Sequence, residues 1–259
     1  MLLSELSRDR VGGGSTAGSL EVMPRRPSVA RRWVTAATWP VGVALTSWDY
    51  MWRSTPMHRS EVLEPSGESH LPPPFPEHVD RTDVIGVADG DGPLFHRRYR
   101  TRIREPAVAP DELFGELAAD LNRAAPTAFA RFQRVLGDSQ SMSLGDEYVV
   151  RMPGPWDGPV RVIDLRERSF RLATLTGHLE AGEIEFRVGQ PDLMTFEIES
   201  WARSASWLSN LLYHRVGMAK EIQLHMWLSF LEGVVAMSGG RMTGGVEIRT
   251  ARVEHGFEG

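Results

Sequence analysis

The chain has 259 residues, of which 41% are hydrophobic and 24% are charged, and this composition is typical of a soluble globular protein. Its formal net charge of -5 at pH 7 argues against nucleic-acid binding, which usually requires a basic face. Cysteine is absent, which excludes disulfides, thiolate metal ligands and a cysteine nucleophile, and agrees with a cytoplasmic location.

The first 54 residues differ in composition from the rest. Residues 1–30 are rich in Gly, Ser, Arg and Pro without any apolar period, so we expect a disordered tail. Residues 31–54 are rich in tryptophan, and their apolar side chains recur at helical spacing; these are Val41, Ala44, Leu45, Trp48 and Trp52. The pattern predicts an amphipathic helix that docks on the domain or on a partner. The alternative is a membrane-peripheral helix, since tryptophans such as Trp48 and Trp52 favour a membrane interface.

A transmembrane span and a folded second domain are both disfavoured in this region. The uncharged stretch from Trp33 to Trp48 has only sixteen residues, short of the roughly 20 that a spanning helix needs. Residues 55–82 contain the run LPPPFP, and three consecutive prolines favour an extended, stiff linker. The main domain is therefore expected over residues 83–259.

The first half of this domain alternates with the period of a β-sheet. Between residues 92 and 103, the apolar Phe95, Tyr99 and Ile103 alternate with a basic outer face of His96, Arg98, Arg100 and Arg102. Pro110 then opens a helix that closes near Asn122. Six further strands are predicted, over residues 129–136, 147–152, 160–165, 169–176, 183–188 and 193–201.

The period changes after Ser204. A long, buried helix is indicated by apolar residues that step by three or four positions, namely Ile222, Met226, Phe230, Val234 and Met237. It ends at Gly239-Gly240. Residues 245–253 are expected to add an edge strand. The order of elements predicts an α+β fold in which the long helix is held against the sheet.

Two stretches carry a resemblance to a known fold family: TLTGHLEAGEIEF, residues 174–186, and FEIESWARSASWLSNLLYHR, residues 196–215. With the element order, they resemble the helix-grip (SRPBCC) superfamily of START-like and birch-allergen-like proteins. Within it, the chain is similar to a family of domains of unknown function, in a long bacterial branch with a tryptophan-rich N-terminal extension. The resemblance implies a curved antiparallel sheet of about six or seven strands around a long C-terminal helix, with a cavity between them. It implies no established activity.

The strongest catalytic candidate is the loop with Thr176, His178, Glu180 and Glu183. A histidine beside carboxylates can exchange a proton near neutral pH. The simpler interpretation, which we favour, is a hairpin whose polar side chains bond to their own backbone. The loop also departs from the commoner family version, which has proline where Thr176 and Leu179 stand.

Other sites have weaker signals. The candidate ligand-binding residues are Trp156, Thr176, His178, Trp201, Met226 and Phe230, because two tryptophans near chain turns suit a pocket mouth and the helix residues suit its floor. Glu221 and His225 are one helical turn apart, but two ligands do not make a metal site. No nucleophile elbow, H-E-x-x-H helix or phosphate loop occurs, so no cofactor or metal is predicted.

Three hypotheses follow. The preferred one is a non-catalytic module that holds an apolar, lipid-like or amphipathic small molecule between sheet and helix. The second is an enzyme of cyclase, isomerase or hydrolase type that uses His178 with Glu180 or Glu183. The third is an interaction protein that docks through the tryptophan-rich helix.

Overall fold

A computed structural model describes the chain over residues 55–64, 68–126, 130–137, 140–152, 157–189, 193–205 and 218–253. The strands in these residues are β1 (Met57–Glu64), β2 (Asp91–Arg104), β3 (Arg131–Leu136), β4 (Glu147–Arg151), β5 (Asp157–Leu165), β6 (Ser169–Thr174), β7 (Glu180–Val188), β8 (Met194–Ser204) and β9 (Arg241–Val253). The α-helices are α2 (Pro110–Ala119) and α4 (Met218–Met237), with short 3-10 turns at Glu68–His70, Val87–Asp89 and Leu121–Arg123.

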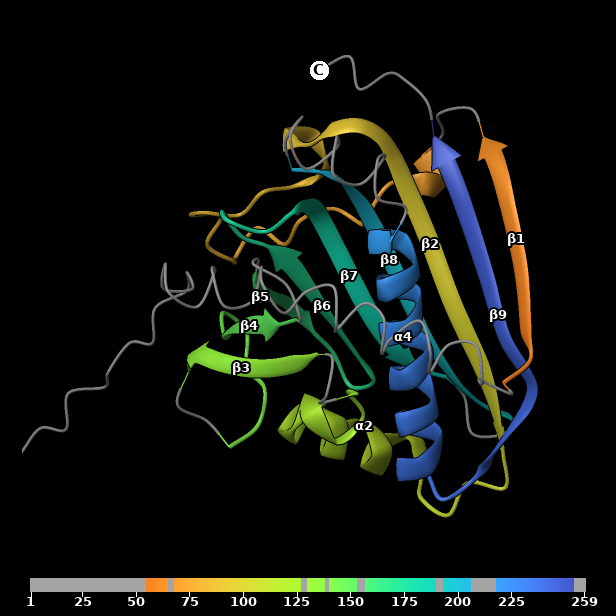
Figure 1. Ribbon diagram of the computed structural model, residues 1–259. Helices are drawn as coiled ribbons and strands as arrows, with labels where there is room; N and C mark the ends of the chain where they lie inside the picture. The colour runs from red at the N-terminus through yellow and green to blue at the C-terminus, as the bar shows by residue number, and fades with distance from the viewer. Residues whose placement is uncertain are drawn as a thin grey trace, which may run out of the picture.

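The nine strands described form one sheet in the order β1-β9-β2-β8-β7-β6-β5-β4-β3. Neighbouring strands are antiparallel except β1 and β9, which pair in parallel. The sheet curves around α4, and α2 covers its lower end (Figure 1). This is the predicted α+β helix-grip fold, with more strands than the expected six or seven.

Helix α4 and the concave face of the sheet share an aromatic core. Phe230 of α4 is fully buried, and its ring centroid lies 5.4 Å from that of Phe186 on β7 and 6.2 Å from that of Phe196 on β8. Trp227, almost one turn earlier, meets Phe186 edge-on at 5.6 Å. Burial of each such side chain contributes about 2 kcal/mol or more, so this cluster fixes α4 against the sheet.

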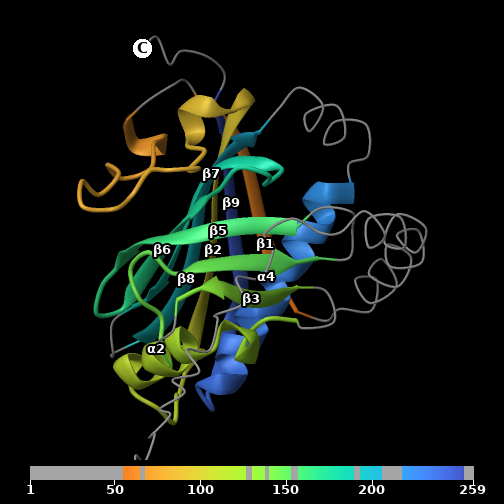
Figure 2. The ribbon, with the colours of Figure 1, turned by 90° about the vertical axis from the view of Figure 1, so that its left-hand side faces the viewer.

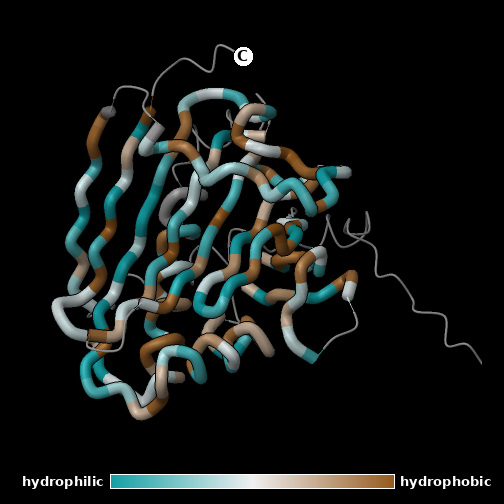
Figure 3. The backbone as a smooth tube through the Cα atoms, turned by 180° about the vertical axis from the view of Figure 1, so that it is seen from behind, coloured by the Kyte–Doolittle hydropathy of each residue, from teal (hydrophilic) through white to brown (hydrophobic). Residues whose placement is uncertain are grey.

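Part of the opposite face of the sheet is covered by a segment that we call the strap, residues 68–90. Figure 2 shows the strap on the far side of the sheet from α4. Along the strands, polar and apolar residues alternate in the view from behind (Figure 3). The alternation on β2 is the predicted one, since Tyr99 and Ile103 are buried while Arg98 and Arg100 are partly exposed.

Two expected features differ from the structure. Residues 55–82 were predicted to be a linker, but within them Met57–Glu64 forms strand β1, which pairs with residues 246–253 of β9. Residues 245–253 were predicted to form an edge strand, whereas β9 lies between β1 and β2. Both differences have one cause: β1 carries mostly polar residues without a buried face, so its pairing could not be read from apolar periodicity.

The expected N-terminal tail and the tryptophan-rich helix, residues 1–54, lie outside the described residues. In the part of the chain that is described, no helix combines the length and the apolar character needed to cross a membrane.

Candidate ligand-binding site

A polar cluster lies on the concave face of the sheet, beneath the first half of α4. Strand β2 contributes Arg97, which has the same orientation as the core residue Tyr99. The Arg97 Nη1 atom lies 3.9 Å from Oε1 of Glu180 on β7 and 3.4 Å from Oε1 of Gln223 on α4. The Gln223 amide donates a 3.1 Å hydrogen bond to Oε2 of Glu180. Three elements thus bring together a cation, an anion and an amide.

Two further polar groups on the same interior surface have no hydrogen-bond partner in the described part of the chain. Ser200 on β8 is directly opposite Arg97 in the strand register, and its Oγ atom is buried without a partner. Trp227 lies one turn after Gln223 on α4, and its Nε1 atom is also buried without a partner. An unsatisfied buried donor costs about 1–3 kcal/mol, so each such group requires an explanation, and a bound molecule is one.

The interior surface is therefore amphipathic. Its apolar part is the aromatic cluster around Phe186 and Phe230, and its polar part is the group formed by Arg97, Glu180 and Ser200. Ile184 lies between the two parts, because it is paired with Ser200 and is two residues from Phe186. Such a surface suits an apolar molecule with one polar end.

The histidine of the predicted catalytic loop has a structural contact. His178 lies in the turn between β6 and β7, and its Nδ1 atom accepts a 2.9 Å hydrogen bond from the backbone N–H of Glu180. Burial of the ring lowers the pKa of His178, against the opposing effect of the Glu180 carboxylate. The same Nδ1 atom also lies 3.0 Å from the Glu180 carbonyl oxygen, and Nε2 faces Gly158 of β5.

The two glutamates of that loop lie on opposite faces of the sheet. They are three residues apart on the regular strand β7, so Glu180 faces α4 and Glu183 faces the strap. Glu183 is buried, and the desolvation raises its pKa to about 7 despite the nearby Arg171 guanidinium. The structure therefore does not bring Glu180 and Glu183 together on one substrate. Thr176, in the same turn, is exposed.

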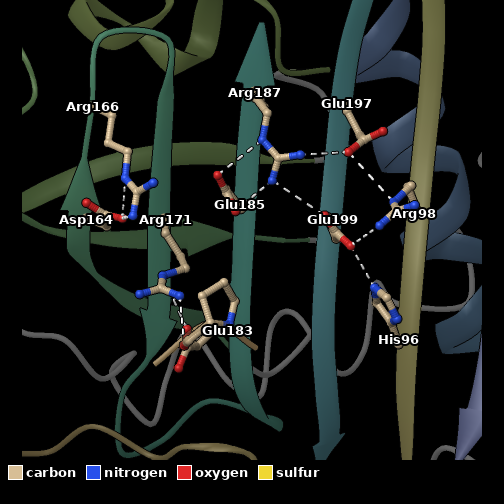
Figure 4. A network of polar contacts seen from close by, with 11 residues as sticks. His96, Arg98, Asp164, Arg166, Arg171, Glu183, Glu185, Arg187, Glu197 and Glu199 are labelled. Atoms are coloured by element: carbon tan, nitrogen blue, oxygen red, sulfur yellow. Dashed lines mark hydrogen bonds and ion pairs between the residues drawn. The ribbon is translucent and has the colours of Figure 1, made fainter. Parts of the chain in front are cut away.

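The strap side of the sheet carries an ion-pair ladder. Figure 4 shows Arg187 between Glu185 and Glu197, and Glu199 in contact with Arg98 and His96. This ladder accounts for the basic face predicted on β2: its arginines pair with glutamates of β8 and β9, as in the 2.6 Å contact between Arg102 and Glu247.

Trp201 belongs to this outer side. Its ring stacks on His96 at 5.4 Å, and it forms a small apolar cluster with Leu94 and Val253 beneath the strap. It therefore lies on the opposite face of the sheet from Met226 and Phe230 of α4, which are both buried in the main core. The remaining ligand-binding candidate, Trp156, lies outside the described residues.

No metal site is formed by the part of the chain that the structure describes, since no three His, Asp or Glu side chains converge there. An open pocket of about 660 Å³ on the strap side is lined by four arginines: Arg166, Arg168, Arg171 and Arg187. Each of them is paired with a carboxylate, so this pocket offers little spare positive charge.

Arg97, Ser200 and Gln223 were not among the residues proposed from the sequence. A signal for Arg97 was present, because its position has the same parity as Phe95, Tyr99 and Ile103 on the apolar side of β2. An arginine in a buried alternation is unusual and is a better guide to function than the exposed arginines beside it. Gln223 had a weaker signal: it lies four residues before Trp227, a spacing that puts both on the same face of a helix.

Fold and interior define a helix-grip domain with a polar cluster under its long helix. The chain belongs to the family described as "Domain of unknown function (DUF1990)", whose model matches residues 82–228. No curated protein matches the sequence.

Several solved structures are similar in fold. Major latex-like protein 151 from Panax ginseng is 13% identical with a TM-score of 0.39, over 57% of this chain and 99% of its own. A hypothetical protein from Helicobacter pylori is 12% identical with a TM-score of 0.41, over 67% and 98%. A polyketide-cyclase-like protein from Corynebacterium glutamicum is 16% identical with a TM-score of 0.32, over 54% and 88%. Likeness at this level carries no conclusion about activity.

Proposed function

We propose that this domain binds a hydrophobic or amphipathic small molecule between the sheet and α4, without transforming it. The observation that carries the proposal is the pair of buried, unpartnered groups on the interior surface, Ser200 Oγ and Trp227 Nε1. A bound molecule that accepts hydrogen bonds from them would recover the 1–3 kcal/mol or so that each costs when unsatisfied. The aromatic side chains beside them supply apolar contacts for the rest of the molecule.

The proposal is tested on gently purified protein by native mass spectrometry, followed by denaturation and extraction. We expect a co-purifying molecule of discrete mass, whose removal lowers the melting temperature and whose return restores it. The variant Trp227→Phe, which keeps the ring but removes the donor, should retain less of it. Repeated absence of any such molecule, with no stabilisation by a panel of apolar compounds, would refute the proposal.

An enzymatic role for His178 has less support. The imidazole is held by the Glu180 backbone, and the two neighbouring carboxylates lie on opposite faces of the sheet. A cyclase, isomerase or hydrolase acting through this loop would need His178 and one carboxylate to reach the same molecule.

We also propose that the protein is cytoplasmic, and that its N-terminal extension, with Trp48 and Trp52, is a bacterial feature of this branch that makes peripheral contacts. Support comes from the sequence pattern alone. A vesicle flotation assay with and without residues 1–54 tests it. Identical behaviour of the two proteins would remove the reason for assigning the tryptophans a membrane role.

A further inference from the structure

We propose that the molecule bound under α4 is a hydrophobic carboxylic acid whose carboxylate is held by Arg97. This inference rests on the proposed function and specifies the chemical class of the ligand. Its basis is the state of the Arg97 guanidinium, which is 3% exposed and has no hydrogen-bonded carboxylate among the described residues.

Buried arginines elsewhere in the same sheet are differently partnered. Arg161, 6% exposed, donates to Oε1 of Glu147 at 2.7 and 3.2 Å and to the carbonyl oxygens of Asp80 and Thr82 at 2.8 Å. Arg171 donates to two strap carbonyls and pairs with Glu183. A buried guanidinium is costly unless it is paired and hydrogen-bonded. Both of these arginines donate two hydrogen bonds to strap carbonyls and have a carboxylate within 3.4 Å, although Nε of Arg171 has no hydrogen-bond partner among the described residues.

Arg97 has fewer and longer contacts. Among the described residues its Nε atom has no hydrogen-bond partner, as for Arg171, but here the remaining contacts are only a 3.4 Å hydrogen bond to Gln223, Glu180 at 3.9 Å and the ring of Phe95 at 4.7 Å from Cζ. Glu180 is engaged by the Gln223 amide and stays beyond hydrogen-bond distance. The guanidinium thus lacks the two-oxygen acceptor that its planar fork fits best, which is a carboxylate.

The neighbouring groups favour the same headgroup. Ser200, whose hydroxyl has no partner among the residues that the structure describes, is opposite Arg97 on β8, so both belong to one patch of the inner surface. A carboxylate accepts hydrogen bonds from a guanidinium and a hydroxyl together, whereas an alcohol or an amine would leave donors unmatched or add a cation beside Arg97. The aromatic cluster next to the patch accounts for the hydrophobic remainder of the acid.

The test compares acids with alcohols of the same skeleton on the full-length protein. The probes are dodecanoic acid with 1-dodecanol, and 1-naphthoic acid with 1-naphthalenemethanol, measured by isothermal titration calorimetry. For at least one pair, we expect the acid to bind roughly tenfold or more tightly than the alcohol, as a charge-assisted hydrogen bond of ordinary strength requires.

Arg97→Gln should lower the affinity for that acid by roughly tenfold or more and leave the affinity for the alcohol nearly unchanged. The alcohol therefore also reports that the variant is folded. Arg100→Gln is the matched control, since Arg100 is on the same strand but points to the outer face and approaches Glu197 at 4.0 Å. It should change neither affinity.

The outcomes separate the two proposals. If acids and alcohols bind equally and Arg97→Gln alters neither, the carboxylate assignment is overturned while binding of apolar molecules stands. If no probe binds and no molecule co-purifies, the proposed function itself fails. If Arg97→Gln no longer binds the alcohol, Ser200→Ala replaces it, with the same selective loss of the acid as the expected result.

Discussion

Arg171 and Glu183 face each other across the β6–β7 pair beneath the strap, with 3.4 Å between Nε of the arginine and Oε2 of the glutamate. The arginine also donates to the carbonyl oxygens of Pro73 and Pro74, so it joins the sheet to the strap. The pair is almost fully buried, and the cost of desolvating the carboxylate exceeds what the arginine returns. As a result, the pKa of Glu183 is raised to about 7.

The raised pKa predicts that stability falls as pH rises towards neutrality. Between the ordinary glutamate value of 4.5 and about 7, the folded state binds a proton that the unfolded state has released. The contribution of Glu183, up to about 3 kcal/mol, is present below pH 4.5 and lost as pH rises through 7. Glu183→Gln should abolish this dependence, as measured by urea unfolding at pH 5 and pH 8. Glu185→Gln, two residues along on the same face, is the control and should keep most of it, because Glu185 contributes least among the groups that shift this pKa.

Glu199 should show the opposite dependence. Burial alone would raise its pKa, but hydrogen bonds from His96 and Arg98 outweigh this and hold the pKa at about 2. Its contribution to stability is therefore present above pH 4.5 and is lost as pH falls through 2. The Glu199→Gln variant should have a free energy of unfolding lower by roughly 2–3 kcal/mol at pH 7. Its free energy of unfolding should also change less between pH 4.5 and 2 than that of the parent protein. If the free energy of unfolding of the variant fell with pH below 4.5 as steeply as that of the parent, Glu199 would not be the group responsible.

Arg161 should be essential to the attachment of the strap. Arg161→Met leaves the buried Glu147 carboxylate without its 2.7 Å partner and releases the strap carbonyls of Asp80 and Thr82. We expect a loss of about 3–5 kcal/mol and faster hydrogen exchange in the strap, with β8 and β9 little changed.

The exposed Arg166, paired with Asp164 at 2.9 Å, supplies the comparison for this variant. Arg166→Met should cost less than about 1 kcal/mol. The double variant Glu147→Gln, Arg161→Met should recover part of the stability, because it removes the orphaned charge. If the single Arg161 variant were as stable as the Arg166 variant, the strap would not depend on this pair.

Phe230 should be the most sensitive apolar position of α4. It is fully buried and contacts Phe132, Phe186, Phe196 and Trp227, so Phe230→Ala removes one member of four aromatic pairs and should cost about 3–5 kcal/mol in denaturant unfolding. The exposed Leu144→Ala should stay within about 0.5 kcal/mol of the parent. If both substitutions lowered the free energy of unfolding by the same amount, α4 would not be packed against the sheet through Phe230.

Local periodicity predicted most of the fold, because strands with one buried face and a long helix carry their own signal. The apolar and polar residues of the predicted strand 92–103 alternate, and this range lies within β2. The long helix predicted through Met226 and Phe230 corresponds to α4. The predicted starts of several strands were displaced by one to three residues, as for β5 and β7, where glycine and polar residues obscure the pattern. The position of β9 depends on pairing with residues nearly 190 positions earlier, which no local pattern contains.

The candidate site was less predictable. The sequence predicted a buried helix through Met226 and Phe230, and both are buried, whereas their role as ligand-binding residues stays a prediction. Trp201 could not be assigned to the strap side, because both faces of β8 are buried there. Glu183 lies on the outer side of its strand, and its burial comes from the strap crossing above. Covering by a distant segment is a tertiary property, so the charge environment of Glu183 and Arg171 had no sequence signal.

The parallel contact between β1 and β9 has a consequence for biosynthesis. Strand β9 lies between β1 and β2. The edges of β1 and β2 that face it can therefore form their hydrogen bonds only after residues 241–253 have been synthesised. A nascent chain released up to residue 240 would expose two open strand edges at once, a state that invites pairing with other chains. Ribosome stalling just before β9 should therefore yield an aggregation-prone, chaperone-bound intermediate, and translation past Val253 should release it.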